Sequence, residues 1–430
     1  MVTTWVPNVS PTSDFSLANL PFGIITTPSD PLPHAAVAIG TWVLDLKALS
    51  AAPLFAAVFP SLPPQIFSHP TLNRFAALGR PTHRAVRATL QSLLSNAADA
   101  DPRLRDDAAL RAAALLPRAS ATSHLPMAVG DYTDFYAGYH HAFAVGALFR
   151  GPGAELQPNY ARLPVGYHGR ASSVVVSGTL IRRPVGQFVL PDDPAGAPVV
   201  GPSRRVDFEV ELGCFMARGN EMGVGVPVEE AEDFVFGYVL LNDWSARDVQ
   251  AWEYVPLGPF NSKNFGTTVS PWVVLADALE PFRVKGVENP AGEVLEYLRG
   301  REDAVFDIGL EVDLTTPEGD TMTISKTTSK HLMWSFPQMI AHHTLGGCPL
   351  RTGDLLGSGT ISGPGGPEER GCLLEMTQGG KKEILLYGMD ARTYLKDGDT
   401  ITIRGACGEP GARVGFGECR GRIYSAEQRK

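Results

Sequence analysis

The chain has 430 residues, 44% of them apolar and 19% charged, with a net charge of −9 and a pI near 5.6. This acidity argues against a nucleic-acid partner, because neutralising phosphates requires clustered Lys and Arg. No apolar run approaches the ~20 residues that a membrane-spanning helix needs, so we expect no membrane partner. Gly (45 residues) and Pro (35 residues) are abundant, which favours a turn-rich, mostly β body.

The five cysteines are scattered along the chain and include no C-x-x-C pair. An odd number without metal-ligand spacing predicts neither a zinc site nor a disulfide framework, and it is typical of a reducing compartment. The first 15 residues lack the basic and apolar regions of a secretory signal peptide. We therefore expect a cytoplasmic protein.

In chain order, the hydrophobic pattern predicts a mostly β, α+β fold with two domains, residues 1–124 and 125–430. The first domain begins with short strands and continues with Ala- and Leu-rich helices: strands over residues 20–27, 36–39 and 41–46, and helices from Pro81 and over residues 107–116. The second is predicted to contain short alternating strands and one clear helix: strands over residues 173–176, 208–214, 235–241, 272–275, 305–314, 322–326, 373–376 and 400–404, and a helix over residues 330–344.

The most informative stretch is VDFEVELGCF, residues 206–215, where apolar and acidic residues alternate. In a strand this places Glu209 and Glu211 on one face, roughly 6–7 Å apart, where a hard divalent cation would relieve their repulsion. The alternative is a solvated strand face, which is the commoner outcome of alternation alone. Residues 305–314 have the same pattern, so alternation does not separate the two interpretations.

Two further acids favour the metal site. Asp134 lies in DYTDFYAGYHHA, and Asp243 follows a predicted strand that is apolar on both faces. A carboxylate at the end of a buried strand needs a partner, since buried charges are rarely left unpaired. Four carboxylates without cysteine or histidine ligands suit Ca²⁺ or Mg²⁺ better than zinc.

Histidines and cations complete the set of candidate groups. His140 and His141 follow Asp134, which favours one of them as a general base, although a structural role is the commoner fate of a histidine. His342 and His343 are expected to be structural, because adjacent residues on a helix do not face one another. Arg247 and Lys263 suit an anionic substrate or a developing oxyanion. The equally supported alternative is pairing with local acids such as Asp248 and Glu253.

Several long segments resemble the fumarylacetoacetase family: LPVGYHGRASSVVVSGT, DFEVELGCF, WEYVPLGPFNSKNFGTT and GDLLGSGTISGP. The resemblance runs from LPFGIITTP to VGFGECRGRIY, nearly the whole chain. It implies an N-terminal SH3-like domain with helices, a C-terminal mixed β-roll domain, and a homodimer. The implied activity is hydrolysis of the carbon–carbon bond of a β-diketo acid, fumarylacetoacetate, to fumarate and acetoacetate in tyrosine and phenylalanine catabolism.

The resemblance also implies residue roles. It implies calcium ligands at Asp134, Glu209, Glu211 and Asp243, and a magnesium position at Asp243, Lys263 and Thr267. The implied general base is His141, oriented by Glu375, with Arg247, Gln250 and Lys263 as donors to developing negative charge. The implied substrate contacts are Tyr136, Arg150, Tyr167, Gln250, Tyr254 and Thr360. Two departures are local: His140 stands where the family has Gln, and the run before Glu375 is longer by about one residue.

Two other functions compete with this one. Shorter metal-dependent members of the same superfamily, such as acylpyruvate hydrolases or decarboxylases, usually lack a block like residues 1–124. A non-catalytic metal-binding protein on the same fold would be expected to lack His141 or Glu375, and both are present.

Overall fold

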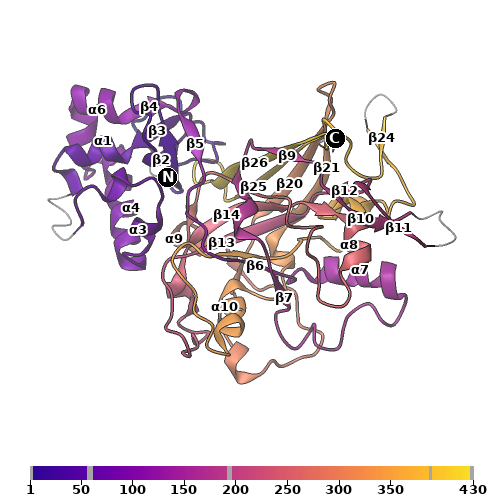
Figure 1. Cartoon of the computed structure of the whole chain (residues 1–430). Helices are drawn as coiled ribbons and strands as arrows, with labels where there is room; N and C mark the ends of the chain where they lie inside the picture. Colours follow the sequence, from indigo (N-terminus) through magenta and orange to yellow (C-terminus); the bar gives the residue numbers. More distant parts are fainter. Residues whose placement is uncertain (1–2, 56–61, 191–195, 387–389, 427–430) are drawn as a thin grey trace.

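The computed structural model describes residues 3–55, 62–190, 196–386 and 390–426. It has a small β-rich N-terminal part and a larger body that contains two sheets, so the predicted mostly β, α+β fold is confirmed. Figure 1 shows the N-terminal part, in indigo and violet, at one side of the larger body. None of the helices in these residues is long and apolar enough to cross a membrane, and all five cysteines are free.

The N-terminal part is built on one five-stranded sheet with helices packed against it. The strand order is β4 (Leu115–Pro117), β3 (Trp42–Asp45), β2 (His34–Ile39), β1 (Phe22–Thr26) and β5 (Thr122–His124). The helices are α1 (Leu46–Ala51), α3 (Asn73–Ala76), α4 (Arg80–Leu94), α5 (Arg103–Asp106) and α6 (Ala108–Ala114). The apolar stripe predicted after Pro81 is buried in α4, as expected for an amphipathic helix.

The larger body packs two sheets around one core. The first sheet has the order β7 (Gly166–His168), β6 (Tyr132–Phe135), β22 (Leu355–Gly357), β13 (Val210–Met216), β14 (Val235–Asp243), β16 (Thr267–Val269) and β8 (Val174–Val176), and β17 (Val274–Leu275) also pairs with β14. The second has the order β21 (Thr321–Thr328), β20 (Gly309–Thr315), β25 (Thr400–Cys407), β26 (Val414–Tyr424) and β9 (Leu180–Arg182). The core includes Leu212 and Leu240 of the first sheet and Ile401 and Ile403 of the second.

Short ribbons and helices surround these sheets. The ribbons are β10–β11 (Val185–Val189, Pro198–Pro202), β12–β15 (Val206–Asp207, Ser245–Ala246), β18–β19 (Arg283–Val284, Val305–Phe306) and β23–β24 (Ile384–Leu385, Ala391–Arg392). The helices are α7 (Tyr139–Arg150), α8 (Arg247–Glu253), α9 (Ala276–Leu279), α10 (Phe336–Thr344) and α11 (Leu373–Met376).

Four local predictions differ from the structure. The strand predicted over residues 305–314 is interrupted, since β19 ends at Phe306 and β20 begins at Gly309. The strand predicted over residues 373–376 is wrong, because these residues form helix α11. The strand predicted over residues 208–214 is interrupted, since β12 ends at Asp207 and β13 begins at Val210. The helix predicted from residue 330 begins at Phe336, where Ser335 and Gln338 form a reciprocal capping box.

Ion pairs join the N-terminal part to the larger body. Arg80, at the start of α4, is buried and contacts Asp277 and Glu280 of the larger body. Arg283 pairs with Glu280 as well, at 2.7 Å between Nε and Oε2. A backbone bridge between Phe22 and residue 273 lies at the same junction. The two parts are therefore held together by charge as well as by apolar packing.

Candidate active site

Four carboxylates meet at one place in the larger body. Asp134 lies on β6, Glu211 on β13 and Asp243 at the end of β14, all strands of one sheet. Glu209 lies in the gap between β12 and β13, where its N–H donates to the side chain of Asn242 on β14 (3.1 Å) instead of to a backbone carbonyl. One oxygen from each acid lies within 4.8 Å of the others, so residues separated by up to 109 positions form one cluster.

These acids are not on a solvated face. Glu209 is 5% exposed and Glu211 is 0% exposed, so the solvated-face alternative is wrong for this strand. The solvated-face interpretation does hold for much of the similar segment, residues 305–314, where Asp307 and Glu311 are exposed. The same alternation therefore gives a buried acidic cluster in one segment, whereas in the other Asp307 and Glu311 face solvent and only Asp313 is buried.

Two cations, Lys263 and Arg247, pair with two of the four acids, Glu209 and Asp243. The ammonium of Lys263 lies between Glu209 and Asp243 and pairs with both, and Arg247 lies 2.8 Å from the second oxygen of Glu209. Burial alone would raise the pKa of Glu209, but Lys263 and Arg247 outweigh it and lower that pKa to about 2. The proposed pairing of these cations with Asp248 and Glu253 is wrong. Those two acids instead accept hydrogen bonds from nearby backbone N–H groups.

The other half of the cluster has no such counter-charge. Burial, together with repulsion between the carboxylates, raises the pKa values of Asp134 and Glu211 well above their usual range. Within the described residues, one oxygen of each has no hydrogen-bond partner, namely Oδ1 of Asp134 and Oε1 of Glu211. The other oxygen of Glu211 accepts from the N–H of Gly359 (3.1 Å). Buried, unpartnered carboxylate oxygens of this kind are suited to binding a cation.

The donor set fits calcium. Ca²⁺ prefers oxygen ligands at about 2.3–2.6 Å, so ligands on opposite sides of one ion lie roughly 5 Å apart. The four carboxylate oxygens all lie within 4.8 Å of one another, close enough for one such ion to contact all of them. The magnesium position is less well supplied with oxygens. Asp243 offers a carboxylate and Thr267 a hydroxyl 3.3 Å from it, but the ammonium of Lys263 has no lone pair to give a metal.

His141 faces this cluster across a cavity and is held by Glu375. Its Nδ1 lies 2.6 Å from Oε2 of Glu375, and both side chains are buried. With the Nδ1 proton donated to the carboxylate, Nε2 keeps its lone pair free to accept a proton. Ser362 (2.8 Å) and Cys372 (3.2 Å) also donate to Oε2 of Glu375. The lowered pKa of Glu375, which burial alone would raise, results from His141 and these donors.

The neighbouring histidines lie elsewhere. His140 packs edge-to-face on His331 (ring centroids 5.2 Å apart) and does not line the cavity. His342 bonds with the hydroxyl of Tyr297 (3.1 Å) and His343 with that of Thr133 (2.8 Å). The structure therefore places His141, and not its chain neighbour, at the cavity.

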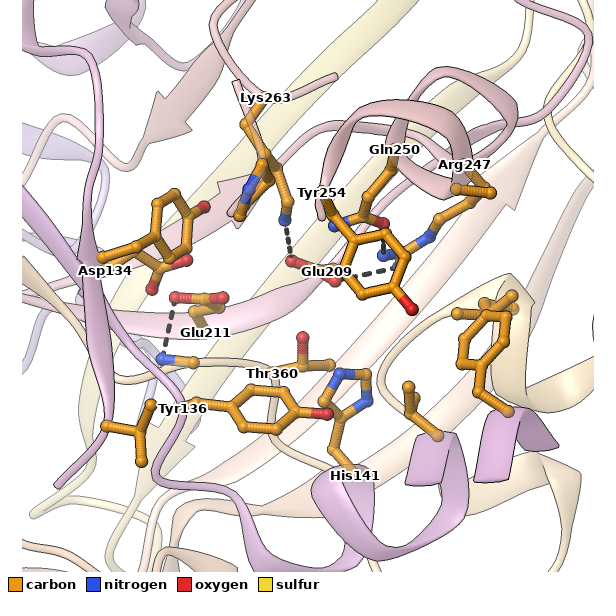
Figure 2. A pocket seen from close by; sticks show the side chains of 18 of the residues that line it. Asp134, Tyr136, His141, Glu209, Glu211, Arg247, Gln250, Tyr254, Lys263 and Thr360 are labelled. Atoms are coloured by element: carbon orange, nitrogen blue, oxygen red, sulfur yellow. Dashed lines mark hydrogen bonds and ion pairs between the residues drawn. The ribbon is translucent and has the colours of Figure 1, made fainter. Parts of the chain in front are cut away.

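The cavity has a volume of about 470 Å³ and lies between the carboxylates and His141. Figure 2 shows Asp134, Glu211 and Lys263 on one side of it, and His141 and Tyr136 on the opposite side. All the residues expected to contact substrate line it: Tyr136, Arg150, Tyr167, Gln250, Tyr254 and Thr360, with Arg247 and Lys263 beside them. Glu375 and Asp243 lie behind the lining and contact His141 and Lys263, which form part of it. Thr267 lies one contact further back, bonded to Asp243.

Two of the polar side chains that line the cavity, those of Tyr167 and Gln250, already form hydrogen bonds with neighbouring side chains. The hydroxyl of Tyr167 donates to Asp243 (3.0 Å), and the carbonyl oxygen of Gln250 accepts from Arg247 (3.1 Å). That second bond fixes the amide of Gln250 so that its NH₂ group is the part left to donate. Tyr254 is half exposed, on the loop at the mouth of the cavity. The polar wall of the cavity is thus oriented by bonds within the wall itself.

The glycine-rich loop of residues 357–366 brings backbone to the cavity, where Gly359 and Thr360 form part of the lining. Gly359 has φ of +78°, and a Cβ there would lie 2.4 Å from the carbonyl oxygen of Phe135. Only glycine fits at this position. Its N–H bonds Glu211, so the loop holds the carboxylate cluster from the side opposite β14.

Sequence reasoning missed three buried polar residues here. Ser362 and Cys372 hold Glu375, and Asp207 binds Arg247 and the N-terminus of α11. Asp207 belongs to the same alternating run as Glu209 and Glu211, which was the available signal. Nothing in the local sequence marks Ser362 or Cys372, because their partner is defined only by the fold.

Comparisons with known proteins cover almost the whole chain. The family model described as fumarylacetoacetate (FAA) hydrolase C-terminal matches residues 132–424, and that described as fumarylacetoacetase N-terminal matches residues 18–126. A fumarylacetoacetase of Aspergillus fumigatus is 53% identical over 432 residues, covering 99% of each chain. The human fumarylacetoacetase is 48% identical over 424 residues, covering 97% of this chain and 98% of that one.

Solved structures are similar at the level of the fold. A fumarylacetoacetate hydrolase from psychrophilic Exiguobacterium antarcticum superposes with a TM-score of 0.51 at 15% identity, covering 94% of this chain and 99% of that chain. At this identity the likeness shows a common fold alone.

Proposed function

The chain belongs to the fumarylacetoacetase family, hydrolases that act on carbon–carbon bonds, and on that premise we propose that it hydrolyses fumarylacetoacetate to fumarate and acetoacetate. One observation carries the proposal: the His141–Glu375 pair and a cluster of four carboxylates face each other across one cavity of about 470 Å³. A base on one side and a cation site on the other are what hydrolysis of a β-diketone requires.

His141 is the proposed general base. Water is a poor nucleophile at neutral pH, and a positioned base contributes roughly 10²–10⁴-fold to the rate. Nε2 of His141 takes the water proton, while Glu375 stabilises the imidazolium that results. The hydroxide adds to a carbonyl carbon of the diketone and gives a tetrahedral oxyanion. The bond to the neighbouring carbon then breaks, and His141 returns a proton to the carbon that leaves as an enolate.

The cations of the cavity stabilise the charge that develops. Lys263 uses two of its three N–H donors on Glu209 and Asp243, which leaves one for an oxyanion. The NH₂ group of Gln250 and the guanidinium of Arg247 supply further donors on the same wall. Tyr136, Arg150, Tyr167, Tyr254 and Thr360 are proposed to hold the polar ends of the substrate.

We propose that Asp134, Glu209, Glu211 and Asp243 hold a calcium ion. When bound, the ion would supply Lewis-acid stabilisation of negative charge on the diketone oxygens. The unpartnered oxygens of Asp134 and Glu211, and the convergence of four carboxylate oxygens within 4.8 Å of one another, support a hard cation such as calcium. The magnesium position at Asp243, Lys263 and Thr267 has the weaker support of a single carboxylate.

The test is the ultraviolet absorbance of fumarylacetoacetate mixed with the purified protein. We expect the absorbance to decay, the decay to stop after treatment with chelator, and calcium to restore it. Absence of decay in calcium-loaded protein would contradict the proposed function. Decay that continues unchanged in metal-free protein would contradict the metal assignment and leave the activity in place.

We also propose that the chain divides into two domains between residues 124 and 125. Separately, we propose that it assembles as a homodimer. The loop beside the cavity exposes several large apolar side chains, including Val255 (65% exposed), Leu257 (96%) and Phe260 (64%). A concentrated apolar loop of this kind usually marks an interface. Leu257→Asp should shift the mass measured by light scattering from dimer to monomer, and a monomeric wild-type protein would refute the dimer.

A further inference from the structure

Asp207 is a buried carboxylate whose every acceptor position is used. It is 0% exposed and is not among the residues that line the cavity in the described part of the chain. Oδ2 accepts from Nε of Arg247 (2.8 Å) and from the N–H of Leu374 (2.9 Å). Oδ1 accepts from the N–H of Leu373 (2.7 Å) and from that of Phe208 (2.9 Å). Four donors on one carboxylate make an arrangement far more specific than a simple ion pair.

The donors come from three segments that each carry part of the site. The strand of Asp207 leads in two residues to Glu209, helix α8 begins at Arg247, and helix α11 carries Glu375. Arg247 reaches the cavity wall (Figure 2), and Glu375 holds the base. A single side chain therefore connects the acidic cluster, the cation and the residue that orients His141.

Helix α11 depends on this contact more than an ordinary helix would. It has four residues, and its N-cap residue, Cys372, makes no side-chain capping bond. A helix of one turn is marginal in isolation, and its first N–H groups need partners from outside. Asp207 supplies those partners from a strand 166 residues earlier. The position of Glu375, and through it the orientation of His141, is fixed by Asp207.

We propose that Asp207 is a positioning residue for the hydrolysis, which sets Glu375 and Arg247 in register with the carboxylate cluster. This inference rests on the proposed function. Aspartate is required because only a carboxylate accepts from all four donors. In asparagine, the NH₂ group would face an N–H donor and leave one side of the arrangement unpaired.

The test compares Asp207→Asn with Asp399→Asn. Asp399 is a matched control, because it is also 0% exposed, binds a buried arginine through both oxygens (Arg392, 2.7 and 2.9 Å) and accepts a backbone N–H (Lys396, 2.8 Å). Unlike Arg247, the partner of Asp207, neither Arg392 nor Lys396 is among the residues that line the cavity. We expect both variants to lose thermal stability. We expect kcat on fumarylacetoacetate to fall about 10–100-fold in Asp207→Asn alone, since a displacement of about 1 Å can cost 10²-fold.

A double-substitution experiment separates positioning from a general loss of stability. In a Glu375→Gln background, Asp207→Asn should lower kcat less than about threefold further, because its main effect passes through Glu375. Calcium affinity measured by calorimetry should change little, since Asp207 is not a proposed ligand. The proposal would be overturned if the fold-reduction of kcat in the double variant equalled the product of the reductions in the two single variants. It would also be overturned if Asp399→Asn lost as much kcat as Asp207→Asn.

Failure of the inference and failure of the function give different results. If wild-type protein does not hydrolyse the substrate, the function is wrong; if wild type and Asp207→Asn are equally active, only the positioning role is wrong. Should Asp207→Asn not fold, Asp207→Glu carries the test, because it keeps the charge but moves the carboxylate by one methylene. Reduced kcat in that folded variant is expected, and wild-type kcat would overturn the proposal.

Discussion

Replacing Glu211 with glutamine is expected to abolish calcium binding while leaving the fold intact. The side chain is 0% exposed, one oxygen bonds Gly359 and the other has no partner among the described residues. Glutamine keeps that shape and removes one of four negative charges. Loss of a group that only orients a metal ligand typically lowers metal affinity by about 10–100-fold. Loss of the ligand Glu211 itself should therefore lower calcium affinity by at least about 100-fold.

The thermal consequence can be estimated. Calcium at 100 times its dissociation constant stabilises the wild type by about 2.7 kcal/mol. With an unfolding entropy of ~2.1 cal/mol/K per residue, 430 residues give about 0.9 kcal/mol/K, so the melting temperature should rise by about 3 °C. The variant should show no rise. In the absence of metal it should melt no lower than wild type, because burial and repulsion by neighbouring carboxylates already raise the pKa of Glu211.

The assay is calcium titration of chelator-treated protein by isothermal titration calorimetry, together with melting curves with and without calcium. The control is Glu311→Gln, an acid at the corresponding kind of position in the similar strand β20, where it is exposed and pairs with Lys326 (2.8 Å). That variant should bind calcium as wild type does. Normal calcium binding by Glu211→Gln would refute the assignment of the cluster as the metal site.

Three further predictions follow from the same contacts. His141→Ala should lower kcat by roughly 10²–10⁴-fold with calcium binding unchanged; unchanged turnover would remove it as the base. Calcium affinity should rise with pH and binding should release protons, because the raised pKa values of Asp134 and Glu211 make protons compete with the ion; calorimetry in buffers of different ionisation enthalpy measures this. Glu280→Gln should lower the melting temperature at neutral pH. Arg283 and Arg80 hold the pKa of Glu280 at about 2, so the stabilisation by this carboxylate is fully present above pH ~4.5 and is lost as pH falls toward 2. The difference in melting temperature between variant and wild type should therefore shrink over that range, and a difference that stays constant would contradict this.

The roles of local and distant contacts are clearest in α11. Residues 373–376, LLEM, are good helix formers, but propensity over a single turn does not by itself produce a helix. They form one because Asp207, far away in the chain, accepts from the first N–H groups of the turn. The strand prediction was wrong here, because a partner 166 residues away has no trace in the local pattern. The amphipathic helix α4, by contrast, was predicted well, since its stripe is a property of neighbouring residues.

The fold class, the family and the candidate acids and histidines can be predicted from the amino-acid sequence, because they follow from local pattern and long matching motifs. It did not determine whether Glu209 and Glu211 face water. Alternation fixes which side chains share a face, but burial depends on what packs against that face, and residues 305–314 show the other outcome. The convergence of the four acids, the bond between His141 and Glu375 across 234 residues, and the contact of Asp207 with Arg247 and helix α11 all join residues far apart in the chain. They arise from the packing of distant segments and leave no mark in the local sequence.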